Sequence, residues 1–205
     1  MGIGIDITYR DYEEIRKIAD EFLVNYHSSG TIPVPIEEIA EFQLKLDIIP
    51  IPGLQKVIET DGFTYGNRTA IAVDQFIYDG RPSRYRFTLA HEIGHIIMHS
   101  QYFEYKVDSI EKWQEYINRM PDKQYRMMEY QANCFAGLVL VPGNKLKELI
   151  PSVIEDIKRT EGYSELSKDY IWEIIESYIS STLEVSNQAI YIRIEKDKIK
   201  DRFVL

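Results

Sequence analysis

The chain has 205 residues, 44% hydrophobic and 28% charged, with a formal net charge of -9 at pH 7. This length supports one substantial hydrophobic core, and the acidic balance argues against direct nucleic-acid binding by its main surface. No segment approaches the length of a membrane span, and the first residues lack the basic and apolar regions of an export signal. With Cys134 as its single cysteine, we expect a cytoplasmic globular protein without disulfides and without membrane association.

The first half of the chain is predicted to hold two helices followed by short strands. Residues 8–27 place apolar side chains at helical spacing, with Thr8 and Asp11 as a candidate capping box. A short helix opened by Pro35 follows. The runs LDIIPIP, FTYGN and AIAVDQF are β-prone and bounded by Gly, Pro and Asn. They predict a small, mostly antiparallel sheet.

The second half is predicted to be helical. Its apolar periodicity indicates helices at about 84–99, 123–140, 144–160 and 166–182, and a final short helix from 186. The order of helices, sheet and helices is typical of an α+β fold. We divide the chain into a domain of residues 1–142 and a C-terminal helical extension, 143–205, packed on it; one continuous domain is the alternative.

The segment RFTLAHEIGHIIMHS, residues 86–100, carries three of the chain's four histidines in an apolar setting. Residues four apart lie on one face of a helix, so His91 and His95 point the same way. Burying these imidazoles and Glu92 without partners would cost several kcal/mol, whereas zinc binds neutral imidazole nitrogens. H-E-x-x-H is the motif of zinc proteases, with the Glu as general base. The alternative interpretation is a buried helix with satisfied core histidines.

A catalytic zinc site needs a third protein ligand and an open position for water. His99 lies too far along the helix to join the other two histidines, so we expect it in the outer shell or the core. Glu129 heads a buried stripe in EYQANCFAGLVLVP. It is the candidate third ligand, and an N-terminal carboxylate favoured by the helix dipole is the alternative. Asn133 is a candidate tether for a ligand or a loop, and Gly94, inside a helix, indicates very close packing.

Two segments, RFTLAHEIGHIIMH and EYQANCFAGLVLVP, together resemble the ImmA/IrrE family of zinc metallopeptidases. The family pattern is F-T-[IL]-A-H-E-[IL]-G-H followed by E-x-x-A-N-x-F-A. PVPIEEIAEFQLKLDI, AIAVD and LEVSNQAIYIRI are similar to further family segments, so that the resemblance covers most of residues 8–195. The family usually has an acidic residue where this chain has Gln131, a departure that we expect to matter little.

The resemblance implies a zincin-like metallopeptidase core with one zinc ion per chain. It implies His91, His95 and Glu129 as metal ligands and Glu92 as the general base. Family members cleave helix-turn-helix repressors, so it further implies an endopeptidase that cleaves such a repressor, or an antitoxin partner, encoded nearby in a mobile-element or stress-response circuit.

Two other functions stay open at this point. A zincin-fold binding or sensor module, or a toxin–antitoxin component, would sequester a repressor without cleaving it; Glu92 favours the enzyme, because a pure binding module does not need a general base. The last helices could instead form a DNA-binding helix-turn-helix. The mixed charges after Ser186 favour a scaffold role for them.

The substrate contacts are less determined by the sequence. Peptide hydrolysis needs a donor for the developing oxyanion, and His99, Tyr125 and Tyr130 are candidates. AIAVDQF is either an edge strand that pairs with an extended substrate or an interior strand. An acidic surface with clustered tyrosines suits a folded partner with basic and apolar patches; these tyrosines are Tyr102, Tyr105, Tyr116, Tyr125 and Tyr130.

Overall fold

The computed structural model describes residues 6–103 and 106–203, and none of the helices in these ranges combines the length and apolar character that crossing a membrane requires. The elements of the first half are α1 (Tyr12–Tyr26), α2 (Ile36–Glu38), a π-helical turn (Ile39–Gln43), β1 (Asp47–Ile51), α3 (Leu54–Ile58), β2 (Gly62–Thr64), β3 (Ala70–Asp74) and α4 (Gln75–Gly80). Those of the second half are α5 (Pro82–His99), α6 (Ile110–Arg119), α7 (Asp122–Leu140), α8 (Gly143–Lys158), α9 (Lys168–Leu183) and α10 (Asn187–Lys196), with 3-10 turns at Ser100–Tyr102, Tyr163–Glu165 and Lys200–Arg202.

The α+β fold class is confirmed, and the long helices of the second half begin and end within about two residues of the predicted bounds. The N-terminal cap of α1 differs from the prediction. Asp11 accepts a hydrogen bond from the backbone N–H of Glu14, whose side chain accepts one from the backbone N–H of Asp11. The capping box is therefore Asp11 with Glu14, and the predicted pair of Thr8 and Asp11 is wrong.

The sheet is mixed. β3 lies between β1, to which it is parallel, and β2, to which it is antiparallel. The prediction of a mostly antiparallel sheet is thus wrong for one of its two ladders, because the chain crosses over through α3 and β2 before it returns as β3. β3 is central and buried along its whole length, so the AIAVD part of AIAVDQF is an interior strand, and Gln75 and Phe76 begin α4. β2 is an edge strand.

Two helices, α5 and α7, pack directly against each other at the centre of the molecule. A Cβ atom on Gly94 of α5 would lie 3.0 Å from Cδ1 of Phe135 on α7. Phe135 is fully buried, and its ring meets that of Phe22 on α1 edge to face at 5.4 Å between centroids. The close packing predicted at Gly94 is therefore confirmed, and it brings the two helices near enough to share a site.

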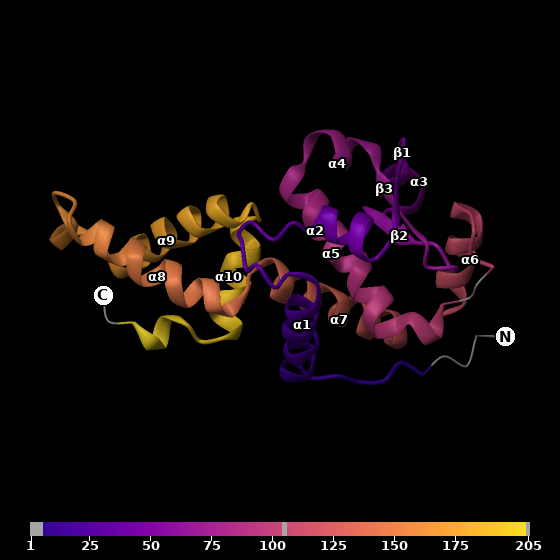
Figure 1. The fold of residues 1–205 in the computed structure, drawn as a ribbon, viewed down its shortest axis with the longest axis horizontal. Helices are drawn as coiled ribbons and strands as arrows, with labels where there is room; N and C mark the ends of the chain where they lie inside the picture. The colour runs from indigo at the N-terminus through magenta and orange to yellow at the C-terminus, as the bar shows by residue number, and fades with distance from the viewer. Residues whose placement is uncertain (1–5, 104–105, 204–205) are drawn as a thin grey trace.

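The C-terminal helices α8, α9 and α10 gather on one side of the molecule, while the sheet, α4 and α6 lie on the other (Figure 1). α1 and α7 lie between these two groups (Figure 1). One hydrophobic core contains Ile15 of α1, Phe135 of α7 and Ile190 of α10, so side chains from both sides of residue 142 share it. The division of the chain at residue 142 stays a prediction.

Candidate active site

Three side chains from α5 and α7 converge on one point. The Nε2 atoms of His91 and His95 lie 2.9 Å apart, and each lies 3.3 Å from a different oxygen of Glu129. Tetrahedral ligands at 2.0–2.1 Å from a zinc ion are about 3.3 Å from one another. The three groups therefore have the mutual spacing of zinc ligands, and the close approach of α5 to α7 produces it.

The charges at this point also suit a divalent cation. Burial lowers the pKa of His91, but the hydrogen bond to Glu129 and the charge of Glu92 outweigh it, and the pKa is raised. Burial raises the pKa of Glu129, but hydrogen bonds to His91 and His95 outweigh it, and the pKa is lowered. Two imidazoles facing one ionised carboxylate form a nitrogen and oxygen donor set that fits zinc.

A chain of hydrogen bonds determines which nitrogen of His95 faces this point. Nε2 of Gln131 donates to the carbonyl oxygen of Thr8 at 2.9 Å, so Oε1 of Gln131 is the acceptor for Nε2–H of His99 at 3.0 Å. Nδ1 of His99 then accepts from Nδ1–H of His95 at 3.1 Å. Nε2 of His95 consequently keeps its lone pair for a metal.

His99 is fully buried, and its ring lies against that of His95. Burial and the neighbouring charge of His95 lower the pKa of His99 to about 3, which keeps the ring neutral. Both of its nitrogens are engaged, with His95 and Gln131, so it is placed in the outer shell and not as an oxyanion donor. Gln131, also fully buried, is a member of this network, and the expectation that the departure from an acidic residue there matters little stays a prediction.

Asn133 contacts Nδ1 of His91, as His99 contacts Nδ1 of His95. Its Oδ1 lies 3.0 Å from Nδ1 of His91 and accepts the ring proton there, so Nε2 is the nitrogen of His91 that would bind a metal once its own proton is lost. Asn133 lies one turn beyond Glu129 on α7, so a single helix supplies both the carboxylate and the tether of the opposite histidine.

Glu92 lies next to this point but is held from another direction. It is 5% exposed, and its Oε2 accepts a hydrogen bond of 2.9 Å from Oγ1 of Thr64 on β2. A Cβ atom on Gly62 would lie 2.7 Å from the carbonyl oxygen of Ala72, so only glycine lets β2 pack this close to β3. The sequence did not indicate Thr64, because its contact with Glu92 depends on how β2 packs beside α5.

Among the described residues, His91, Glu92 and His95 are the one group of at least three potential metal ligands whose ligand atoms all lie within 4.8 Å of one another. Glu129 faces both histidines from the neighbouring helix. Residues 77–195, more than half of the chain, match the family model of the IrrE N-terminal-like domain, a peptidase family. The chain belongs to this family. No curated protein matches it.

The match makes this IrrE-like chain a member of a metallopeptidase family, and it places the H-E-x-x-H helix inside the matched region. The matched residues run across residue 142 and include α8, α9 and most of α10. The C-terminal helices α8 and α9 and most of α10 therefore lie within the region that matches the family. The resemblance read from the two central motifs is confirmed.

The cleft over the site is narrow, with a volume of about 40 Å³. Tyr125 lines it, and burial together with the charges of Glu129 and Glu92 raises the pKa of Tyr125 to about 12. Tyr130 does not line it; its hydroxyl lies 3.2 Å from Nζ of Lys196. The remaining residues that line this cleft lie on or near β2, the turn after α5, α6 and α7. They are Thr60, Gly62, Phe63, Thr64, Tyr102, Phe103, Val107, Trp113, Tyr116, Ile117, Tyr125 and Met128.

The tyrosines predicted to form a surface cluster have different surroundings. Tyr116 is buried, 5% exposed, and its hydroxyl donates to the carbonyl oxygen of Tyr102. Tyr105 lies outside the described residues. The prediction of a single exposed tyrosine surface is therefore wrong for Tyr116, whose ring belongs to a small core under α6.

Proposed function

We propose that this protein is a zinc-dependent endopeptidase in which His91, His95 and Glu129 hold one zinc ion and Glu92 is the general base. One observation carries the proposal. Two imidazole lone pairs and one carboxylate face a common point, while a second carboxylate beside them is held separately by Thr64. A binding module needs the first arrangement at most, whereas hydrolysis needs both.

Zinc bound at the three ligands would supply the Lewis acid that lowers the pKa of a water molecule to about 7. Glu92 removes the proton as the water attacks the peptide carbonyl, and it later gives a proton to the leaving amine. Thr64 holds Oε2 of Glu92, so Oε1 carries the proton. Tyr125 lines the same cleft, and its hydroxyl, with a pKa of about 12, is protonated at neutral pH, so it can donate to the oxyanion.

The substrate would bind along β2. This edge strand lines the cleft through Gly62, Phe63 and Thr64, so an extended peptide would gain backbone hydrogen bonds by pairing with the edge that carries no strand in the described sheet. A volume of about 40 Å³ holds a water molecule but no peptide. The walls around the site therefore have to move apart on binding, which favours slow, selective cleavage over broad digestion.

A helix-turn-helix repressor is the substrate that we propose, with relief of repression in a mobile-element or stress-response circuit as the outcome. The net charge of -9 attracts the basic surface of a DNA-binding protein, and this attraction weakens as salt is raised. The competing function is sequestration of the same repressor without cleavage.

Incubation of the zinc-loaded protein with casein and with the repressor encoded beside it tests the proposal. We expect cleavage of the repressor at one or a few sites while casein stays intact. Parallel reactions with Glu92→Gln distinguish the two functions, because a variant that releases the repressor from DNA as well as the wild type does would establish sequestration. Rapid casein digestion with an intact repressor would overturn the proposed substrate.

A further inference from the structure

A second cleft, of about 690 Å³, lies away from the metal site, between α1, the start of α8, α10 and the turn at Lys200–Arg202. Its volume is in the range of small-molecule binding sites. Its lining holds five Lys and Arg residues against two acidic ones, Asp20 and Asp197, in a chain of net charge -9. The basic residues are Arg16, Lys145, Lys147, Arg193 and Arg202.

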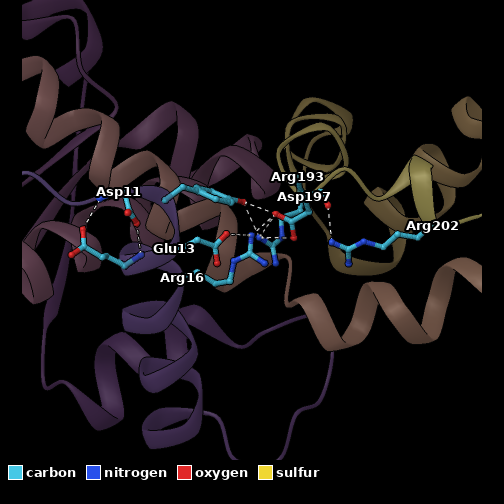
Figure 2. Close-up of polar contacts among 8 residues, drawn as sticks. Asp11, Glu13, Arg16, Arg193, Asp197 and Arg202 are labelled. Atoms are coloured by element: carbon cyan, nitrogen blue, oxygen red, sulfur yellow. Dashed lines mark hydrogen bonds and ion pairs between the residues drawn. The ribbon is translucent and has the colours of Figure 1, made fainter.

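Three of these arginines gather around one acidic residue (Figure 2). The carboxylate of Asp197 lies 2.7 Å from Nη2 of Arg16 and 3.2 Å from Nη1 of Arg193, and its carbonyl oxygen accepts from Nη2 of Arg202 at 2.8 Å. Arg16 also meets Glu13, at 3.1 Å, but that carboxylate is 68% exposed and contributes little. The cluster, which we call the arginine cluster, therefore has an excess of positive charge.

Two donors of the arginine cluster have no acceptor. Nε of Arg16 and Nε of Arg193 are both buried without a hydrogen-bond partner in the described part of the chain. The Arg193 side chain is only 5% exposed. A buried donor left unpaired costs about 1–3 kcal/mol, and such groups in native proteins usually meet a water molecule or an ion. Because both Nε atoms are enclosed by the protein, a ligand in the cleft would meet Arg16 and Arg193 through their Nη groups.

The first turn of α8 adds backbone donors at the same place. Pro142 caps this 16-residue helix without a side-chain hydrogen bond, so the N–H groups of Gly143 and Asn144 have no partner within the helix. A Cβ atom on Gly143 would lie 3.0 Å from Nη2 of Arg193. The buried guanidinium therefore lies against the positive end of the helix dipole, and the two positive groups together favour an anion beside them.

We propose that this cleft binds a phosphate group carried by a small molecule. Phosphate oxygens match the paired donors of a guanidinium and the N–H groups of a helix N-terminus. Apolar side chains of Leu23, Ile150 and Phe203 line the same cleft and suit an organic part attached to the phosphate. The basic and apolar parts of the lining thus match the two halves of one phosphorylated ligand, and the site is independent of the peptidase chemistry.

Titration calorimetry of the full-length protein with inorganic phosphate and with phenyl phosphate tests this proposal, at constant ionic strength. We expect saturable binding and a loss of affinity of about tenfold or more in Arg16→Met and in Arg202→Met, because each removes charge-assisted hydrogen bonds. Both variants leave Asp197 paired with Arg193 and so preserve the core. The matched control is Arg159→Met, at the opposite end of α8 with a 76% exposed side chain, which should bind as the wild type does.

The two probes also distinguish the sources of the phosphate. Tighter binding of phenyl phosphate supports a phosphorylated organic ligand, whereas equal affinities support free phosphate in the same site and overturn the organic half of the proposal. Absence of saturable binding up to about 10 mM, where an interaction would be weaker than about -3 kcal/mol, overturns the site. Equal affinity in the wild type and both arginine variants overturns it as well, since phosphate would then be binding elsewhere, for example at the metal site.

Discussion

The cleft over the candidate metal ligands, called the metal cleft below, and the arginine cluster differ in how their polar atoms are paired. Around the metal ligands nearly every polar atom has a partner that determines its role, from Gln131 through His99 to His95. In the arginine cluster one acidic residue serves three guanidiniums, and two buried donors stay unpaired. The polar atoms of the first site are held by partners within the protein, whereas the second site, as proposed, gains hydrogen bonds from a bound phosphate.

The difference in volume agrees with this contrast. The metal cleft encloses about 40 Å³ and the second cleft about 690 Å³. A narrow, fully bonded site suits chemistry on one atom, because small displacements of reacting groups are costly there. A wide site with unpaired donors suits binding. Substitutions in one site should therefore leave the other unchanged, and this independence is open to measurement.

The largest expected effect is that of Glu92→Gln on peptide cleavage. The change keeps the size of the side chain and the hydrogen bond from Thr64 but removes the proton acceptor, so the cleavage rate should fall by about 10²–10⁴-fold. Zinc content and phosphate affinity should stay as in the wild type. Glu111→Gln, on an exposed part of α6, is the matched control. A variant that cleaves within threefold of the wild type would remove Glu92 from the mechanism.

The next effect concerns the metal itself. Glu129→Gln replaces an ionised ligand by a neutral one, so the affinity for zinc should fall by more than the factor of about 10–100 that outer-shell substitutions cause. Competition with a chelator measures it. Glu92→Gln serves here as the matched control, because the same substitution beside the same histidines should leave zinc affinity nearly unchanged. Equal losses in the two variants would place Glu92 among the ligands together with Glu129, and an unchanged affinity in Glu129→Gln would remove Glu129 from them.

The candidate metal ligands could be proposed from the sequence because they depend on short-range regularity. His91 and His95 lie one turn apart on a single helix, and Glu129 heads a stripe on another. Thr64 and the hydrogen bonds of Gln131 depend instead on how β2, α5 and the segment before α1 meet, which no local pattern encodes. The parallel ladder of β1 and β3 was missed for the same reason.

The arginine cluster is the feature that local sequence patterns predict least. Arg16 and Asp197 are 181 residues apart, and each looks like an ordinary surface charge on an amphipathic helix. Only the packing of α1 beside α10 and the start of α8 brings the three arginines together. Sequence periodicity predicts which face of a helix is buried, but it does not predict which charged residue at the edge of that face meets another.

The third prediction tests the network behind His95. Gln131→Leu removes the acceptor of His99, so His95 loses the partner that orients its lone pair, and zinc affinity should fall by about 10–100-fold. Gln131→Glu keeps an acceptor for His99 and should retain most of the affinity. Gln188→Leu, on an exposed position of α10, controls for the change of side chain. If Gln131→Leu binds zinc as the wild type does, His95 is oriented without this network.

The smallest expected effect is on the free energy of unfolding. It is measured at two glycines inside helices that differ in what a Cβ atom would contact. In Gly94→Ala the new methyl group would lie 3.0 Å from Phe135, whose ring is held in the core by Phe22, so overpacking of about 1–3 kcal/mol outweighs the gain of about 1 kcal/mol in helix propensity. Gly137 on α7 has nothing within 4 Å of a Cβ atom, so Gly137→Ala gains the propensity without the strain. Chemical denaturation should show a lower free energy of unfolding for the first variant and a higher one for the second.

The same pair of variants also separates stability from the geometry of the metal site. Gly94→Ala pushes α5 from α7, so it should lower zinc affinity as well as stability, while Gly137→Ala should leave zinc affinity unchanged. Phosphate affinity should be the same in both, because the arginine cluster lies on α1, α10 and the turn after α10. A Gly94→Ala protein that is as stable as the wild type and binds zinc equally well would show that Phe135 yields to the methyl group, and that the spacing of the two helices does not hold the ligands in place.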